Sequence, residues 1–339
     1  MNAMPTEEVA TERGAIMSRF GFAFVLALSA AAVSAQDPSH GWPARAVRII
    51  VPSSPGGATD RYARLLAQGL SENLKHQFIV DNRPGASGNI GAVAAARAVP
   101  DGYTILVASN QALAISPSLE RNLPYNVERD FAPVARGVMI RVFVFVVHPS
   151  LQAKTLADLV AIGKREPGKL PYGSAGAASP AYLCVRMFEE ASGARFLHVP
   201  FKGLGQGMQS LMSGDIKFTL ADIGAVLPHI RSGRLLALAV TERTASLPGT
   251  PTLAEAGYPN LEVFASFSVV APSGTPRAIV QRLGAEVVKA MKSPPILEKL
   301  EAQAMIPVFD TPDVFAASLK KESEMWARVI RRNAITADQ

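Results

Sequence analysis

Hydrophobic and polar residues alternate along the chain with the two periods expected of strands and helices that follow one another. The apolar run VRIIV at residues 47–51 stops at a proline, which is typical of a buried strand. The next segment, 60–74, instead places Tyr62, Leu66 and Leu70 on one helical face. Comparable strand, helix and strand patterns follow over 78–80, 90–98 and 101–109. This βαβαβ order predicts a parallel sheet with helices on both faces.

A second unit with the same rhythm begins near residue 142. The run VFVFVV predicts a strand, and Thr155 with Asp158 predicts a capped helix start. The segment 169–193 then repeats the opening design, with a short strand, a loop of Ser, Gly and Ala, and a helix. Ser179 is a suitable N-cap, Pro180 a suitable first helical residue and Gly193 a suitable end. Further strands are expected within 196–203, 215–222 and 234–241.

The final third of the chain shows the same succession of strand and helix patterns as the first unit. A strand is expected over 264–272. Thr275 and Thr311 are expected to cap two helices, with Pro276 and Pro312 as their first residues. We therefore predict an α/β protein of two lobes with parallel or mixed sheets. Lobe 1 is discontinuous and comprises 36–138 with 263–339, whereas lobe 2 comprises 139–262. Two crossings make a hinge, and the cleft between the lobes is the expected ligand site.

Composition and charge narrow the class of protein. The 339 residues are 48% hydrophobic and 18% charged, which indicates a globular chain long enough for two domains. The net charge of +6 is scattered, and its densest cluster, Arg328, Arg331 and Arg332, is more typical of a solvated helix face than of a nucleic-acid site. Cys184 is the single cysteine, so no intrachain disulfide can form and burial as a small hydrophobe is expected.

The N-terminus has the layout of a secretory signal. Arg19 precedes an apolar run over 20–33, and small residues follow at Val33, Ser34 and Ala35, which predicts cleavage after Ala35. The residues before Met17 include three Glu and do not resemble the start of a signal, so Met17 is a candidate for the true start. The signal peptide and N-terminal extension would then comprise 1–35, and the exported chain would reach the periplasm.

Two loops of small residues carry the candidate chemistry. Each lobe presents one of them directly before a helix, where backbone N–H groups are unpaired and the helix dipole is positive. Small residues allow a ligand to approach that backbone closely. Such a site suits an anion, and two of them facing across a cleft suit a carboxylate. A purely geometric role in strand-to-helix turns remains the alternative for either loop.

Signals for an enzyme are weak. The chain has no nucleophile elbow, no dinucleotide-binding fingerprint and no Walker lysine motif. The five histidines are not spaced as metal ligands, and structural roles are favoured for His198 and His229. Lys202 could neutralise a carboxylate, although a surface lysine is the simpler interpretation. Asp60 lies in a first helical turn, where an acid favours the dipole, and contact with an anion is disfavoured.

These segments together resemble one family. VPSSPGGATDRYARLLAQGL, VDNRPGASGNIGA, PDGYTIL, YGSAGAASPAYL, HVPFKG, LPHIRSGRLLALAVT and PTLAEAGYP are similar, in order, to the Bug receptors, the TctC-like extracytoplasmic solute receptors of tripartite tricarboxylate transporters. The resemblance covers essentially all of the expected mature chain. It implies a periplasmic-binding-protein fold of type II, small carboxylate ligands, integral-membrane transporter subunits as partners, a monomer, no nucleic acid, no metal, no cofactor and no catalysis.

Carried over by position, the resemblance implies a set of ligand-binding residues in the two loops. The set is Ser53, Ser54, Gly56, Gly57, Ala58, Asp60, Ser174, Ala175, Gly176, Ala177 and Ser179. Two positions depart from the family pattern, since Ser53 stands where an aromatic residue is usual and Tyr182 where a histidine is usual. Both departures bear on ligand identity rather than on the fold. A receptor that feeds a sensor kinase, and a secreted enzyme that acts on a small organic acid, remain the alternatives to a transport receptor.

Overall fold

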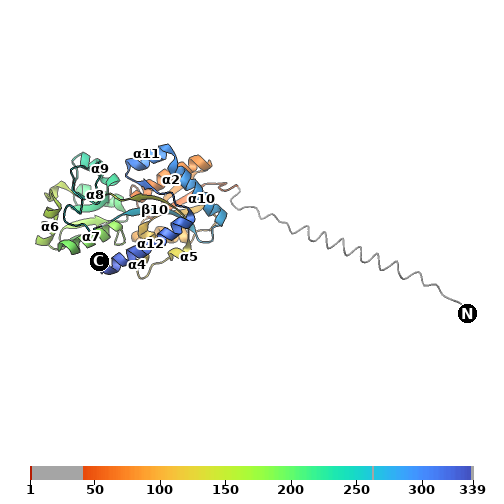
Figure 1. Cartoon of the computed structure of the whole chain (residues 1–339), viewed down its shortest axis with the longest axis horizontal. Helices are drawn as coiled ribbons and strands as arrows, with labels where there is room; N and C mark the ends of the chain where they lie inside the picture. The colour runs from red at the N-terminus through yellow and green to blue at the C-terminus, as the bar shows by residue number, and fades with distance from the viewer. Residues whose placement is uncertain (2–40, 262, 337–339) are drawn as a thin grey trace.

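The computed structural model describes residues 1, 41–261 and 263–336. The expected signal peptide and its cleavage point lie outside these residues. No helix within them is long and apolar enough to cross a membrane. The described chain forms two lobes, each built on one sheet covered by helices (Figure 1). The expected α/β fold of two lobes is therefore confirmed.

The sheet of lobe 1 has six strands in the order β11-β4-β10-β3-β1-β2. β1 pairs in parallel with β2 and β3, whereas β10 runs antiparallel between β3 and β4, so the sheet is mixed. Its strands are β1 (Val47–Val51), β2 (Phe78–Asn82), β3 (Thr104–Ser109), β4 (Phe131–Ile140), β10 (Ala265–Pro272) and β11 (Ile306–Pro307). Its helical segments are α2 (Ala58–Leu74), η2 (Ala86–Gly88), α3 (Asn89–Ala96), η3 (Gln111–Ile115), α4 (Ser116–Leu119), α5 (Val127–Asp130), α10 (Arg277–Lys292), α11 (Pro294–Ala302) and α12 (Pro312–Arg332).

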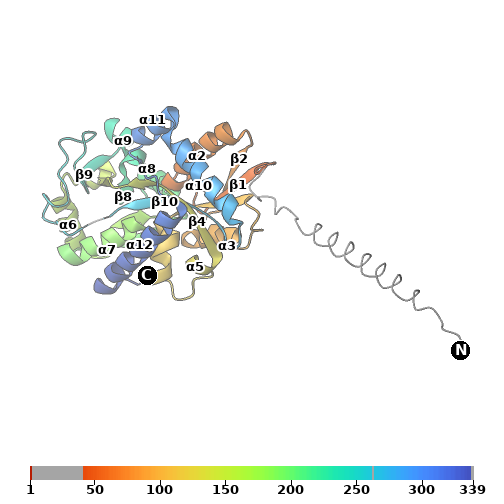
Figure 2. The ribbon, with the colours of Figure 1, turned by 45° about the vertical axis from the view of Figure 1, so that its right-hand side comes forward.

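The sheet of lobe 2 has five strands in the order β7-β6-β8-β5-β9. β6 pairs in parallel with β7 and β8, and β5 runs antiparallel to β8 and β9. The strands are β5 (Phe143–Val147), β6 (Pro171–Ser174), β7 (Leu197–Pro200), β8 (Phe218–Asp222) and β9 (Leu236–Val240). The helical segments are η4 (Pro149–Leu151), α6 (Leu156–Arg165), α7 (Pro180–Ser192), α8 (Leu204–Ser213) and α9 (Ile223–Arg231). In Figure 2, α8 and α9 lie on one side of this sheet and α6 and α7 on the other.

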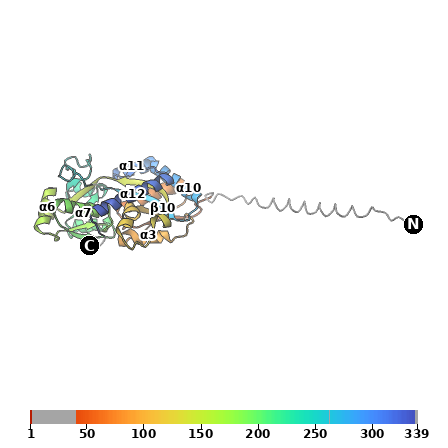
Figure 3. The same ribbon diagram turned by 60° about the horizontal axis from the view of Figure 1, so that its bottom comes forward.

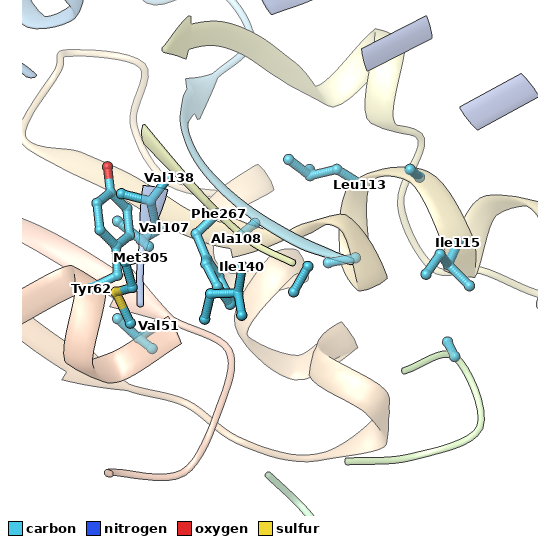
Figure 4. Packing of buried hydrophobic residues seen from close by; sticks show 14 of the residues in the cluster. Val51, Tyr62, Val107, Ala108, Leu113, Ile115, Val138, Ile140, Phe267 and Met305 are labelled. Carbon is cyan, nitrogen blue, oxygen red and sulfur yellow. The ribbon is translucent and has the colours of Figure 1, made fainter. Parts of the chain in front are cut away.

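Two neighbouring residues of β4 face the helices on opposite sides of the lobe 1 sheet, at a point where the register between β4 and β10 shifts. Arg136 faces α12, where its guanidinium contacts the buried Glu322 at 3.1 Å. The next residue, Gly137, faces α2, and a Cβ there would overlap the hydroxyl of Tyr62. The missing side chain at Gly137 thus makes room for the buried Tyr62 ring, which packs near Phe267 of β10 (Figure 4).

The wholly apolar strand β5 separates two packing layers of lobe 2. Val144 and Val146 face the layer under α8 and α9, whereas Phe145 faces the opposite layer and packs on Phe188 of α7. Because neighbouring residues of a strand point to opposite faces, a strand buried on both sides must be apolar throughout. The pattern of β5 is therefore the direct consequence of helices on both faces.

Most helix starts follow the expected capping pattern. Thr155 and Asp158 form a reciprocal capping box, Ser179 caps α7 with Pro180 as its first residue, and Thr311 caps α12. The expectation for Thr275 is wrong, because α10 begins at residue 277 and the Thr275 hydroxyl donates to the Pro272 carbonyl instead. The polar side chain closes the turn after β10, so it is not available to cap the helix.

The chain crosses between the lobes along two paired strands. The last residue of β4, Ile140, lies opposite the first residue of β10, Ala265, and β5 begins three residues after Ile140. The expected boundary at 138/139 falls within β4, and the one at 262/263 falls just before β10. α12 runs from lobe 1 toward α7 of lobe 2, as Figures 1 and 3 show, and residues of both helices line a shared groove.

Candidate functional site

One cavity lies between the two lobes at the carboxyl ends of the parallel strands. It encloses about 110 Å³, and this location is the usual ligand site of open α/β sheets. Its walls come from both lobes. They comprise Pro52, Ser53, Gly57, Ala58, Thr59, Ser87, Gly88, Ser109, Asn110, Gln111, Ala112, Ile140, Phe143, Ser174, Ala175, Ser179, Pro180, Ala181, Lys202, Gly203, Leu204, Leu220, Ala221, Asp222, Ala265 and Phe267.

The first loop joins β1 to α2 and is held in shape by the first turn of that helix. Gly56 has a φ of +82°, a conformation that favours glycine. Its amide donates to the Asp60 carboxylate at 2.9 Å, and its carbonyl accepts from Arg61 at 3.2 Å. Asn82 of β2 donates both to Asp60 and to the Ser53 carbonyl. Asp60 therefore braces the loop from behind and does not line the cavity.

The environment of Asp60 keeps its carboxyl group ionised. Burial by itself would raise the pKa, but hydrogen bonds from Arg64, the Gly56 amide and Asn82 together lower the pKa below its usual 3.8. The Arg64 guanidinium lies 3.0 Å from the carboxylate, one helical turn further along α2. A charged carboxylate with several donors is a stable anchor for the loop.

The two helix N-termini at the cavity are not equivalent. α2 has Gly57 as its N-cap, and no side chain caps it within the described chain. Its first residues, Ala58 and Thr59, line the cavity, and the first amides of a helix have no partner within that helix. α7 is capped by the Ser179 hydroxyl and has Pro180 at its first position, so it offers fewer amides. The N-terminus of α2 is thus the stronger candidate for an anion site.

The second loop joins β6 to α7 and is organised by two serine hydroxyls. Ser174 is buried, contacts the His198 Nε2 at 2.7 Å, and bonds to Gly176. The Ser179 hydroxyl donates to the Gly176 carbonyl at 2.8 Å. His198 lies on β7 and its ring packs 4.5 Å from that of Tyr182. This histidine therefore supports the loop from the neighbouring strand.

Lobe 2 approaches lobe 1 closely at four glycines. A Cβ on Gly205 would lie 2.5 Å from the Pro55 carbonyl oxygen, and one on Gly203 would lie 2.9 Å from the Ser54 amide. Similar approaches bring Gly176 to Ser87 and Gly224 to Gln303. The Gln111 side chain also donates across the cavity to the Ala175 carbonyl at 3.3 Å. The two lobes are therefore in contact around the cavity.

The charged groups at the cavity leave one positive charge without a partner once the Arg61 that pairs with Asp222 is counted. The described lining residues include two charged side chains, Lys202 and Asp222. Asp222 is paired with Arg61 at 2.6 Å, whereas Lys202 makes no ion pair with any described residue. The remaining wall divides into a polar part at the loops and an apolar part that includes Ile140, Phe143 and Phe267. No group of three or more metal-ligating side chains occurs in the part of the chain that the structure describes.

The predicted site residues divide into two groups. Six of them line the cavity, namely Ser53, Gly57, Ala58, Ser174, Ala175 and Ser179, and five do not, namely Ser54, Gly56, Asp60, Gly176 and Ala177. Of the two positions that depart from the family pattern, Ser53 lines the cavity and Tyr182 does not. Lys202, for which a surface position was favoured, is exposed and also lines the cavity.

Sequence reasoning missed three other parts of the wall. Ser87 and Gly88 follow β2, Ser109 to Gln111 end and follow β3, and Asp222 ends β8. Each segment lies at the carboxyl end of a parallel strand. Ligands of open α/β sheets usually bind at that edge, so this general rule could have identified the three segments. Ser87 also has a φ of +54°, a left-handed conformation that is uncommon outside glycine and often occurs at functional sites.

Two lobes joined by paired strands, with strand–loop–helix units from each facing one cavity, define a solute-binding protein of the periplasmic type. The chain belongs to the TctC family, since residues 62–335 match the family described as the tripartite tricarboxylate transporter family receptor. This is a family of solute receptors and not of enzymes.

Relatives of known sequence or structure cover nearly the whole chain. Protein BugT of Bordetella pertussis is 36% identical over 307 residues, which span 90% of this chain and 94% of BugT. A Rhodopseudomonas palustris protein solved with adipate is 33% identical with a TM-score of 0.82, over 87% of this chain and 99% of that one. MatC of the same organism, solved with bound malate, is 28% identical with a TM-score of 0.80, over 85% and 100% of the two chains.

Proposed function

We propose that this protein is a periplasmic receptor that captures a small carboxylate between its lobes and delivers it to a membrane transporter of the tripartite tricarboxylate type. The observation that carries the proposal is the uncapped N-terminus of α2 at a cavity where, among the described lining residues, Lys202 is the charged side chain that makes no ion pair. Both features favour an anion. The adipate and malate bound to the two structural relatives, which are carboxylates, support the same class of ligand.

The contacts with ligand divide between the loops. We assign the carboxylate to the amides of Ala58 and Thr59, with Gly57 as the point of close approach and the hydroxyls of Ser53 and Ser174 beside it. The buried residues Asp60 and Gly176 shape the loops from behind. The apolar wall formed by Ile140, Phe143 and Phe267 would contact the carbon skeleton of the ligand. Lobe boundaries at 138/139 and 262/263, export with cleavage after Ala35, and a monomeric state belong to the same proposal.

A thermal-shift screen tests the ligand class. Small mono- and dicarboxylates should raise the melting temperature, because a ligand at 100 times its Kd adds about 2.7 kcal/mol to the native state. Their esters and amides should have little effect, since they lack the charge that the helix end favours. If neutral analogues stabilise the protein as well as the acids do, the anion site at α2 is refuted.

A substitution at Gly57 tests the location of the site. The backbone of Gly57 suits any residue, since its φ is −69°, and a Cβ there would meet only the Ser54 carbonyl at 3.5 Å and the Ser53 hydroxyl at 4.0 Å. Gly57→Val would therefore fill ligand space and leave the fold intact. We expect affinity to fall at least about tenfold, equal to about 1.4 kcal/mol. Gly249→Val, at a loop position where a Cβ meets nothing within 4 Å, is the matched control, and equal affinities in the two variants would place the site elsewhere.

A further inference from the structure

Arg61, in the first turn of α2, connects three separate parts of the molecule. Its Nη1 donates to the Gly56 carbonyl at 3.2 Å, and its Nε donates to the Gln303 side chain at 2.9 Å. Both of these partners belong to lobe 1. Its Nη2 donates to the Asp222 carboxylate of lobe 2 at 2.6 Å. A single side chain thus contacts the first ligand loop, the segment after α11 and the opposite lobe.

Asp222 occupies an equally specific position. It is the last residue of β8 and the N-cap of α9, where its Oδ1 accepts from the Ala225 amide at 3.0 Å. It also lines the cavity. Its side chain is 3% exposed and that of Arg61 is 20% exposed. A buried carboxylate without a cation is costly, so the arrangement in which the lobes meet depends on Arg61 to neutralise this charge.

The packing beside the Arg61–Asp222 ion pair shows that this pair forms where the two lobes touch. A Cβ on Gly224, two residues after Asp222, would lie 2.5 Å from the Gln303 carbonyl oxygen. Separation of the lobes would therefore pull Asp222 away from Arg61 and expose both groups to water. Arg64 provides the contrast. It pairs with Asp60 on its own helix, and this contact is independent of the distance between the lobes.

We propose that Arg61 and Asp222 form an interlobe clamp that holds the lobes together and slows ligand release. The part of this inference that concerns ligand release rests on the proposed function. Arg61 is a positioning residue that acts through the first loop and through lobe closure. Because it holds the Gly56 carbonyl and Asp222 at the same time, the shape of the anion-binding loop is coupled to closure. A ligand at the start of α2 leaves only after the pair has opened, so the clamp acts mainly on the dissociation rate.

The test compares Arg61→Gln, Asp222→Asn and the double variant with the control Arg64→Gln. Asparagine is also a good N-cap, so Asp222→Asn removes the charge and keeps the start of α9. The first measurement needs no ligand. Spin labels on Glu72→Cys in α2 and Gln209→Cys in α8, both exposed positions, report the distance between the lobes. Cys184 is buried and takes no label.

We expect both clamp variants to shift the distance distribution toward wider separations, with no further shift in the double variant, because each substitution breaks the same contact. The distance distribution of Arg64→Gln should match that of the wild type, because its contact with Asp60 lies within one lobe. The second measurement is the rate of release of malate and adipate, as probes, in stopped-flow experiments. For each probe that the wild type binds, release should be about tenfold faster in the clamp variants, with association within about twofold, which corresponds to about 1.4 kcal/mol.

The outcomes separate the two proposals. Wild-type distance distributions in both Arg61→Gln and Asp222→Asn would overturn the clamp, and so would shifts that add in the double variant. If instead the wild-type protein binds no carboxylate in the screen, the proposed function fails, while the distance measurement still decides whether the clamp exists.

Discussion

Gly205 allows a substitution that should stabilise one lobe and impair closure at the same time. Gly205 is the second residue of α8, and its backbone has no left-handed angle. Within lobe 2, Gly205→Ala should therefore be favourable, because alanine in a helix is about 0.8–1.0 kcal/mol better than glycine. Across the cavity, however, the new Cβ would lie 2.5 Å from the Pro55 carbonyl oxygen, closer than such contacts occur.

The cost of this contact falls on the closed arrangement alone. The Pro55 oxygen is a backbone atom of the first loop, so it cannot rotate away as a side chain would. Overpacking of this kind typically costs about 1–3 kcal/mol. Since ligand binding requires closure, we expect affinity for a carboxylate to fall about 5- to 150-fold. The unfolding free energy of the ligand-free protein should stay the same or rise by up to about 1 kcal/mol, because the open arrangement avoids the contact.

Isothermal titration calorimetry and urea denaturation measure the two effects separately. Gly207→Ala is the matched control, since it lies on the same helix and its Cβ would approach the Phe201 ring of lobe 2 itself at 3.3 Å. The control should bind within about twofold of the wild type, a difference of only about 0.4 kcal/mol. If Gly205→Ala binds as tightly as the control, α8 does not approach the first loop in the ligand-bound state, and the reasoning is refuted.

Three further predictions concern stability, reactivity and processing. The lowered pKa of Asp60 means that its ionised form stabilises the fold above pH 3.8 and that this contribution is lost as the pH falls below that value. The difference in unfolding free energy between wild type and Asp60→Asn should therefore shrink on acidification. A difference that does not depend on pH would contradict this prediction. Burial raises the pKa of Cys184 to about 12, so a thiol reagent at pH 8 should react only after denaturant is added, and fast labelling of the native protein would refute this. N-terminal sequencing of protein from the periplasm should begin at Gln36, and retention of the apolar run 20–33 would exclude the expected signal.

The periodic elements could be predicted from the sequence because their patterns are local. β1, α2, β5 and the caps at Thr155, Ser179 and Thr311 follow directly from alternation, helical spacing and capping residues. β4 was not predicted as a strand. Its segment FAPVARGVMI contains a proline, a buried arginine and a glycine, which break the apolar pattern. Those residues are explained only by distant partners, since Arg136 meets Glu322 and Gly137 makes room for Tyr62.

The candidate site was predictable to a similar degree. The two loops could be found because small residues before a helix are a local signal, and six of their residues line the cavity. The strand-end rule could have placed Asp222 and Gln111 at the cavity, but their contacts depend on how the lobes meet and carry no local signal. The brace by Asp60 is an intermediate case. The position of Asp60 in the first helical turn was evident from the sequence. Its hydrogen bond from the Gly56 amide could be seen only in the three-dimensional structure of the loop.

The central place of β10 in the lobe 1 sheet has a consequence for how the chain folds. β10 is the only strand that pairs with both β3 and β4 among the described strands, yet it comes after all five strands of the other sheet. The two halves of the lobe 1 sheet therefore cannot join until residues 265–272 have been synthesised and inserted. Contacts between such distant segments form slowly, because a long loop must close first. The strands of lobe 2 come from the continuous segment 143–240, so we expect this inserted lobe to fold first and to bring β4 and β10 together at its base.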